Sequence, residues 1–245
     1  MVANGSMKQA AGSAMANWHV FEDRDTLVTA LKSDIETMLR AALQARGHAS
    51  WAVSGGSTPQ PLFEAMQQSS LDWQKVDVAL VDERWVPFEH ARSNEAFVAD
   101  SLMKGRAASA CLVGMKTAHD HAHLAVSEVN RRYASVADPF DSILLGLGPD
   151  AHTASLFPGA DGLEEAFAPD APTCVALKAI KSNVTGNELE RMSLSAAAIA
   201  KAPHVTLMIT GEEKKTVLEQ ALNSGGSTPV ARLHEMKPFE IYWAP

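Results

Sequence analysis

Short apolar runs that alternate with longer stretches of helical periodicity are the feature that most constrains the fold of this chain. The apolar runs predict strands at residues 50–53, 76–81, 141–147, 174–180, 204–210 and 239–243. The periodic stretches predict helices at residues 23–46, 61–68, 93–103, 119–133, 195–201 and 212–222. Strands that alternate with helices indicate βαβ units. We therefore expect an α/β protein whose mostly parallel sheet carries helices on both faces.

The chain is expected to form a single domain over residues 17–245, because no low-complexity linker divides it. Residues 1–16 lack the apolar core of a signal peptide and are predicted to be disordered. No apolar run approaches the roughly 20 residues of a membrane span. The net charge of −8 argues against broad nucleic-acid binding, which needs a basic surface.

The two cysteines, Cys111 and Cys174, are too few for a disulfide framework and fit a reducing compartment. We therefore expect a cytoplasmic protein that binds neither nucleic acid nor a membrane. A monomer and a small homo-oligomer are both open at this point.

The hexapeptide SGGSTP occurs twice, at residues 54–59 and at residues 224–229. The first copy follows a predicted strand and precedes a predicted helix, where Thr58 suits the N-cap and Pro59 the first helical position. Glycine N–H groups and hydroxyls at a helix N-terminus can hold an anion. A phosphate cradle and a plain Gly–Ser turn are equally weighted interpretations. The candidate phosphate ligands are Ser54, Gly55, Gly56, Ser57 and Thr58.

The second copy follows the predicted helix 212–222 instead of a strand. Its glycines suit a helix C-terminus, and Pro229 lies where a helix cannot continue. We therefore expect a cap and a turn there, without a phosphate role.

Charged residues follow the predicted strand 76–81 directly, with Asp82, Glu83 and Arg84 in a row. Ligands of parallel sheets bind at the carboxyl ends of strands, so these residues are candidates for a site. A solvated loop with ion pairs is the alternative.

The segment 146–159 also leaves a strand, and it carries Asp150 and then His152 at a predicted helix start. A histidine there can act as a general base near neutral pH, although a structural or surface histidine is the commoner case.

Two further cations are candidates, Arg191 and Lys214. Lys214 lies in the first turn of a predicted helix, where a cation is unfavourable and an anionic ligand would offset the cost. A tolerated surface lysine is the alternative.

The cluster HDHAH places His119 and His123 four residues apart on the predicted helix 119–133, a spacing that can chelate a metal. No third ligand is evident nearby, so a solvated face is favoured over a metal site.

Taken in order, these motifs resemble the 6-phosphogluconolactonase family over residues 18–243. The motifs are SGGSTP, DERWVP…SN, G-x-G-x-D-x-HTASLFPG, R-x-S-x-S and TG-x-x-K. The family belongs to a larger group that includes glucosamine-6-phosphate isomerase/deaminase and has a Rossmann-like α/β fold. The resemblance implies hydrolysis of the small sugar phosphate 6-phospho-D-glucono-1,5-lactone to 6-phosphogluconate, in the oxidative pentose phosphate pathway. It implies no metal and no cofactor.

On this hypothesis the phosphate binds to residues 54–58, helped by Arg191 and Lys214, while Arg84 is a second phosphate ligand or a hydroxyl ligand. His152 activates water, and the backbone of residues 146–148 is a candidate oxyanion site. Asp150 and Asp82 are both candidates for orienting the imidazole.

One residue departs from the family pattern, since Ala151 stands where the family usually has glycine. Alanine costs on the order of 1 kcal/mol if the position needs a positive φ, and nothing if it begins a helix.

Two other functions compete with the lactonase. An amino-sugar-phosphate isomerase/deaminase needs several acid–base groups, and its relatives carry glutamate where this chain has Phe157. A non-catalytic sugar-phosphate sensor would usually carry a DNA-binding segment, which the acidic chain and its short predicted extension do not suggest.

Overall fold

The computed structural model describes residues 16–136 and 139–245. The predicted disordered extension, residues 1–16, lies outside the described residues except for Ala16. Among the described residues, no helix combines the length and the apolar character that crossing a membrane requires.

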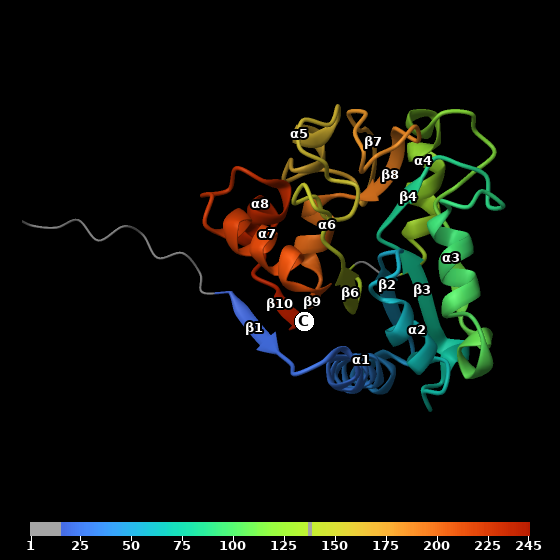
Figure 1. Cartoon of the computed structure of the whole chain (residues 1–245). Helices are drawn as coiled ribbons and strands as arrows, with labels where there is room; N and C mark the ends of the chain where they lie inside the picture. The colour runs from blue at the N-terminus through green and yellow to red at the C-terminus, as the bar shows by residue number, and fades with distance from the viewer. Residues whose placement is uncertain (1–15, 137–138) are drawn as a thin grey trace, which may run out of the picture.

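A seven-stranded sheet forms the centre of the molecule, and all of its strand pairs are parallel. The mostly parallel sheet predicted from the apolar runs is therefore confirmed. From left to right in Figure 1, the labelled strands of this sheet are β1 (Asn17–Val20), β10 (Glu240–Ala244), β9 (His204–Thr210), β6 (Ser142–Leu145), β2 (Ala49–Val53) and β3 (Val76–Leu80). The strand β5 (Cys111–Val113) pairs with β3 and forms the other edge of the sheet.

Eight α-helices and two short 3₁₀ helices connect these strands in the described residues. The longest helix begins after Asp23, whose side chain accepts from the Thr26 N–H, and ends at Gly47 with φ 74°. The elements are α1 (Arg24–Arg46), α2 (Gln60–Met66), η1 (Trp73–Lys75), α3 (Asn94–Ser101), η2 (Gly105–Ser109), α4 (Ala122–Tyr133), α5 (Leu163–Ala166), α6 (Ala196–Lys201), α7 (Glu212–Leu222) and α8 (Pro229–Met236).

The direction of strand addition reverses between β2 and β6. From β2 the chain proceeds outward through β3 to β5, whereas from β6 it proceeds outward through β9 to β10 on the other side. Right-handed crossovers then put the two groups of connecting helices on opposite faces of the sheet. The loops after β2 and β6 part from each other at this reversal, which makes it the expected place for a ligand crevice.

A second, antiparallel sheet was not predicted. It consists of β4 (Asp82–Arg84), β8 (Glu190–Leu194) and β7 (Cys174–Lys178), in the order β4-β8-β7. The predicted strand 174–180 therefore exists, but it lies outside the parallel sheet. The pairing of β4 with β8 sets Arg84 opposite Arg191. Two sequence motifs more than a hundred residues apart thus become neighbours.

The two SGGSTP copies differ in a way that partly corrects the sequence-based interpretation. The second copy follows α7 with Gly225 and Gly226 at positive φ, as a turn requires. A new helix, α8, begins within this copy, with Thr228 as N-cap and Pro229 as first residue. The preceding helix α7 does end before this proline, at Leu222, but the start of α8 at Pro229 was not predicted, although proline is well suited to a first helical position.

Candidate active site

A cavity of about 250 Å³ lies at the carboxyl end of the parallel sheet. The segments that follow β2, β3, β6 and β9 all contribute to it, so it occupies the crevice expected from the reversal of strand order. Its lining residues are Ser54, Gly55, Gly56, Ser57, Thr58, Pro59, Asp82, Arg84, Asn94, Gly146, Leu147, Gly148, His152, Ala154 and Lys214.

The first SGGSTP copy forms one side of this cavity. The hydroxyl of Ser54 is buried and has no hydrogen-bond partner among the described residues, so it is a donor available to a ligand. Gly56 has φ 104°, a conformation that side chains rarely adopt, and a Cβ atom there would meet nothing within 4 Å. The glycine is therefore needed for the backbone conformation, and the space beside it is open.

Thr58 does not cap α2, which corrects the prediction made for it. The helix begins at Gln60 with Pro59 as N-cap and without a side-chain cap. The Thr58 hydroxyl instead accepts a hydrogen bond of 3.2 Å from the Nζ of Lys214. A phosphate-sized ligand beside this loop would therefore face both a hydroxyl and an ammonium group.

Lys214 lies in the first turn of α7, as predicted. Burial lowers the pKa of its ammonium group, because desolvation disfavours the charged form. Its position at the positive end of the helix adds to this cost. An anion bound between Lys214 and the Ser54–Thr58 loop would stabilise the ammonium group.

His152 lies in an irregular segment and not at the start of a helix, so the predicted helix start is wrong. Two residues beside it have a left-handed backbone conformation that does not fit an α-helix: Ala151 with φ 61° and Ala154 with φ 51°. The Nδ1 atom of His152 makes a short contact with Oδ1 of Asp150. This pairing directs Nε2, the other ring nitrogen, away from the carboxylate.

The environment of His152 favours an ionised Asp150. Burial works against the charged form of this carboxyl, but the hydrogen bonds from His152 and its charge together lower the pKa of Asp150. On the other side, Phe157 stacks on the imidazole with ring centroids 4.0 Å apart and an interplanar angle of 29°. The ring is therefore held by a carboxylate at one edge and by a phenyl face.

Asp82 also lines the cavity but makes different contacts. Its Oδ2 accepts a hydrogen bond of 2.5 Å from the Ser155 hydroxyl, and its Oδ1 and carbonyl oxygen accept from the side-chain amide of Asn94. Among the described residues, the carboxylate that contacts the imidazole is Asp150 and not Asp82.

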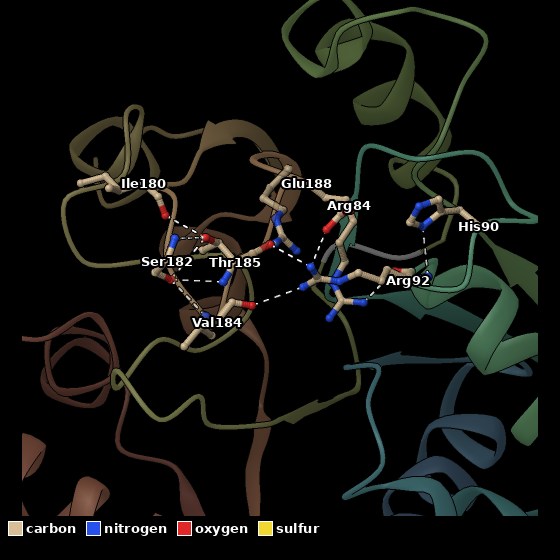
Figure 2. A network of polar contacts seen from close by, with 9 residues as sticks. Arg84, His90, Arg92, Ile180, Ser182, Val184, Thr185 and Glu188 are labelled. Carbon is tan, nitrogen blue, oxygen red and sulfur yellow. Dashed lines mark hydrogen bonds and ion pairs between the residues drawn. The ribbon is translucent and has the colours of Figure 1, made fainter.

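Arg84 lines the cavity from β4 and is anchored by a neighbouring arginine (Figure 2). Its Nη1 donates to the carbonyl oxygen of Arg92 at 2.6 Å. The Arg92 guanidinium in turn donates to the carbonyl oxygens of Thr185 and Val184, and pairs with Glu188. Figure 2 shows this network joining the segment after β4 to the loop between β7 and β8.

Arg191 is more deeply buried than the other predicted phosphate ligands, although it lies opposite Arg84 across the β4–β8 pair. It is 2% exposed and is not among the residues that line the cavity. Its Nη2 donates to the Thr185 carbonyl, and its guanidinium carbon lies 5.3 Å from the centroid of the Phe157 ring. Burial lowers the pKa of Arg191 to about 10, because desolvation disfavours the charged form, and the charge of Asp82 offsets this only in part. The structure thus places Arg191 behind the cavity lining, where Phe157 separates it from the imidazole of His152.

The predicted oxyanion segment is partly occupied. The N–H of Gly148 donates to the carbonyl oxygen of His152 at 2.9 Å. Gly146 and Leu147 also line the cavity. Of the three residues in this segment, Gly146 and Leu147 therefore stay candidates for a backbone donor, whereas the Gly148 N–H is already engaged.

The histidine cluster does not form the predicted helical pair. The helix α4 begins at Ala122, so His119 precedes it and only His123 belongs to it. His121 contacts Glu190, and His119 contacts Thr117. The described residues contain no group of three or more His, Cys, Asp or Glu side chains arranged to hold a metal ion.

Sequence reasoning misses two residues that contact Asp82. Asn94 belongs to the SN pair, but an asparagine at a helix start resembles an ordinary polar residue. Ser155 appears in the sequence only as part of the HTASLFPG motif. The signal available for both was their place in motifs that meet at strand ends, but their contacts with Asp82 depend on the fold.

The comparisons with known proteins agree with this geometry. The family described as glucosamine-6-phosphate isomerases/6-phosphogluconolactonase matches residues 22–243. A 6-phosphogluconolactonase of Rhizobium meliloti is 43% identical over 234 residues, which cover 94% of this chain and 99% of the relative. One of Pseudomonas putida is 37% identical over 230 residues, which cover 93% and 92%.

A solved structure supports the same grouping. The crystal structure of a 6-phosphogluconolactonase from Shewanella baltica OS155 superposes with a TM-score of 0.87 at 34% identity. The match covers 95% of this chain and 99% of that chain.

Proposed function

The chain belongs to the glucosamine-6-phosphate isomerase/6-phosphogluconolactonase family, and from this membership together with the cavity we propose that it hydrolyses 6-phospho-D-glucono-1,5-lactone to 6-phosphogluconate. This reaction is a step of the oxidative pentose phosphate pathway. The cytoplasmic location and the monomeric or small oligomeric state expected from the sequence stay predictions.

The single observation that carries the proposal is that His152, which is paired with Asp150, lines the same cavity as the Ser54–Thr58 loop and Lys214. With Asp150 ionised, Nδ1 of the imidazole carries the proton and Nε2 is the free base. In this arrangement Nε2 takes a proton from water, and the resulting hydroxide attacks the lactone carbonyl carbon.

The tetrahedral intermediate then collapses. The bond between the carbonyl carbon and the ring oxygen breaks, and His152 returns its proton to that oxygen, which becomes a hydroxyl group. Backbone N–H groups of Gly146 and Leu147 are the candidates for stabilising the oxyanion. Phe157 restricts rotation of the imidazole while contributing no proton-transfer group.

The phosphate of the substrate is assigned to Ser54, Gly55, Gly56, Ser57 and Thr58 together with Lys214. The unpartnered Ser54 hydroxyl and the partly desolvated Lys214 support this assignment, because both would gain from an anion. Arg84 is a further candidate for the phosphate or for a hydroxyl. Arg191, which was predicted as a direct ligand, is assigned to the supporting wall because of its burial.

The isomerase/deaminase is the alternative within this family. It must open a sugar ring and move a proton between two carbons, which requires several placed acid–base groups. Phe157 stacks on His152 where the deaminase relatives have glutamate, and a phenyl ring transfers no proton. This observation favours the lactonase.

The test is hydrolysis of 6-phosphogluconolactone by the purified protein, with the spontaneous rate subtracted, alongside ammonia release from glucosamine 6-phosphate. We expect lactone hydrolysis well above background and no measurable ammonia. The proposal would be refuted if the protein did not accelerate hydrolysis of the lactone. Ammonia release at a rate comparable with lactone hydrolysis would instead support the deaminase reaction.

A further inference from the structure

Asn94 links two sides of the cavity through one buried side chain. It is the first residue of α3, is 3% exposed, and lines the cavity. Its Nδ2 donates to the carbonyl oxygen of Asp82 at 2.9 Å and to the Asp82 Oδ1 at 3.3 Å. Both partners are acceptors only, so they fix which end of the amide is the nitrogen.

The oxygen end of the same amide lies against Gly55. A Cβ atom at Gly55 would overlap the Oδ1 of Asn94, so only glycine leaves room for this contact. Gly55 itself lines the cavity. The Asn94 amide therefore reaches from the carboxylate of Asp82 to the Ser54–Thr58 loop, and its carbonyl oxygen lies between that carboxylate and that loop.

Asp82 has acceptor capacity that its protein partners leave unused. An ionised carboxylate offers about four lone-pair sites. The Asp82 side chain receives one hydrogen bond from Ser155 and one from Asn94. Its remaining capacity lies in a group that lines the cavity and is 8% exposed.

The cavity is thus chemically divided. The Ser54–Thr58 loop, Lys214 and Arg84 offer donors and positive charge, which suit an anion. Asp82 and the Asn94 oxygen offer acceptors, which repel a phosphate and suit O–H donors. A ligand with an anionic group at one end and hydroxyl groups along its length matches both parts in one orientation.

We propose that Asp82 and Asn94 form a hydroxyl-binding pair, which accepts hydrogen bonds from the hydroxyl groups of the sugar. In this pair Asn94 positions the Asp82 carboxylate and adds its own carbonyl oxygen as a second acceptor. This inference rests on the proposed lactonase function and adds to it a basis for discriminating between substrates. The pair plays no part in the proton transfer by His152.

The physical reason for discrimination is the cost of unpaired acceptors. When a substrate lacks the hydroxyl, the buried acceptors lose their water without gaining a partner, and a site built to bond a hydroxyl rejects such analogues strongly. Phosphate recognition, by contrast, does not distinguish a hydroxylated sugar from its deoxy analogue. Asn94 therefore affects selectivity in a way that a residue needed only for folding does not.

The experiment compares kcat/KM for 6-phosphogluconolactone with kcat/KM for its monodeoxy analogues, in the wild type and in Asn94→Ala. The wild type is expected to prefer the full substrate over at least one analogue by about tenfold or more, as for a hydrogen bond to a charged acceptor. Asn94→Ala should reduce that ratio about threefold to tenfold, since it removes one neutral acceptor and releases Asp82.

Ser93→Ala is the matched control. Ser93 caps the same helix by accepting from the Ala96 N–H and is not a cavity residue. It should lower the stability of α3 while leaving the substrate ratio unchanged. Asn94→Asp is a second probe, because it keeps the shape but sets a carboxylate against Asp82, and it should raise KM for the full substrate more than for the sensitive analogue.

The outcomes separate this inference from the proposed function. A wild type without lactonase activity refutes the function itself. If the wild type is active, two results would overturn the hydroxyl-binding pair. One is a preference for the full substrate over its deoxy analogues that is unchanged in folded Asn94→Ala and Asn94→Asp. The other is an equal change of this preference in Ser93→Ala.

Discussion

At the scale of single residues, the segment around His152 combines a short carboxylate contact with an unfavourable backbone. Ala151, directly before the histidine, has φ 61°, and it stands where the family usually has glycine. The left-handed conformation costs an L-residue about 1–2 kcal/mol because Cβ approaches the following carbonyl oxygen. Of the two possibilities weighed from the sequence, the structure therefore shows the strained one.

Ala151→Gly is expected to stabilise the protein by up to about 1 kcal/mol, since relief of strain is partly offset by the greater chain entropy of glycine in the unfolded state. Chemical denaturation measures the change. Ala198→Gly is the control, because Ala198 is equally buried but lies in α6, where glycine should destabilise by about 1 kcal/mol. Equal destabilisation by both changes would contradict the assigned strain.

His152→Asn tests the proposed general base directly. We expect a fall in kcat of about 10²–10⁴, the usual contribution of general acid–base catalysis. His204→Asn, at the exposed start of β9, is the matched control and should behave as wild type. Near-wild-type turnover by a folded His152→Asn protein would remove the histidine from the mechanism.

At the scale of elements, the start of α3 depends on a buried carboxylate. Glu83 is fully buried, and its two oxygens accept from the N–H groups of Arg84, Asn94 and Glu95 and from the Ser93 hydroxyl. Burial outweighs these hydrogen bonds and raises the pKa of Glu83 to about 7. The side chain therefore joins β4 to the helix that carries Asn94.

This raised pKa predicts how stability depends on pH. Between the ordinary value of 4.5 and about 7, the folded protein binds the extra proton and the unfolded chain does not. The contribution of Glu83 to stability is therefore fully present below pH 4.5 and is lost as the pH rises to about 7, by at most about 3 kcal/mol.

Urea unfolding at pH 5, 6, 7 and 8 measures this contribution. The slope of the free energy of unfolding against pH should be more negative in the wild type than in Glu83→Gln, in which the group cannot titrate. The comparison concerns slopes, because the amide also alters the hydrogen bonds at the start of α3. Parallel slopes in the two proteins would contradict the raised pKa.

The same elements show what the sequence could and could not predict. The five inner strands of the parallel sheet were predictable because each is a short, largely buried apolar run, as β2 is at every position. The two edge strands, β1 and β5, were not predicted, because they are short and partly exposed. The strand β4 was not predicted either, because its sequence DER has no apolar alternation and becomes a strand only by pairing with β8. Arg191 followed from its motif, but its burial in the wall depends on that same pairing.

Asp82 and Lys214 both line the cavity, and their place there follows from the ends of the strands that precede them, although their roles stay predictions. Predictions at the site failed where local chemistry has two solutions. Thr58 was expected to cap α2, but its hydroxyl faces Lys214, which is 156 residues away in sequence. The contacts of Asn94 could not be anticipated either, because they require β2 and β3 to be neighbours and α3 to begin beside them.

At the scale of the whole molecule, the two SGGSTP copies show how position in the fold decides function. The first lies where the strand order reverses, at the carboxyl end of β2 and beside the cavity. The second joins α7 to α8 and is not among the cavity residues. Identical sequences therefore have one conformational requirement in common, glycine at positive φ, but different surroundings.

Gly56→Ala and Gly226→Ala form a matched pair for testing this difference. Both glycines have positive φ, 104° and 78°, so both alanines should destabilise the protein by a similar amount, on the order of 1 kcal/mol. Only the methyl group at residue 56 would enter open space beside the proposed phosphate site; at residue 226 it would meet the flexible end of Glu235.

Gly56→Ala should therefore raise KM for the phospholactone at least several-fold, whereas Gly226→Ala should leave it unchanged. Inhibition by inorganic phosphate provides a second readout, since the anion alone should lose affinity for Gly56→Ala. If the two folded variants lose substrate affinity equally, the effect comes from general destabilisation and the phosphate is not bound by the first loop. If Gly56→Ala binds both ligands as the wild type does, the anion lies elsewhere in the cavity, and Arg84 becomes its principal candidate.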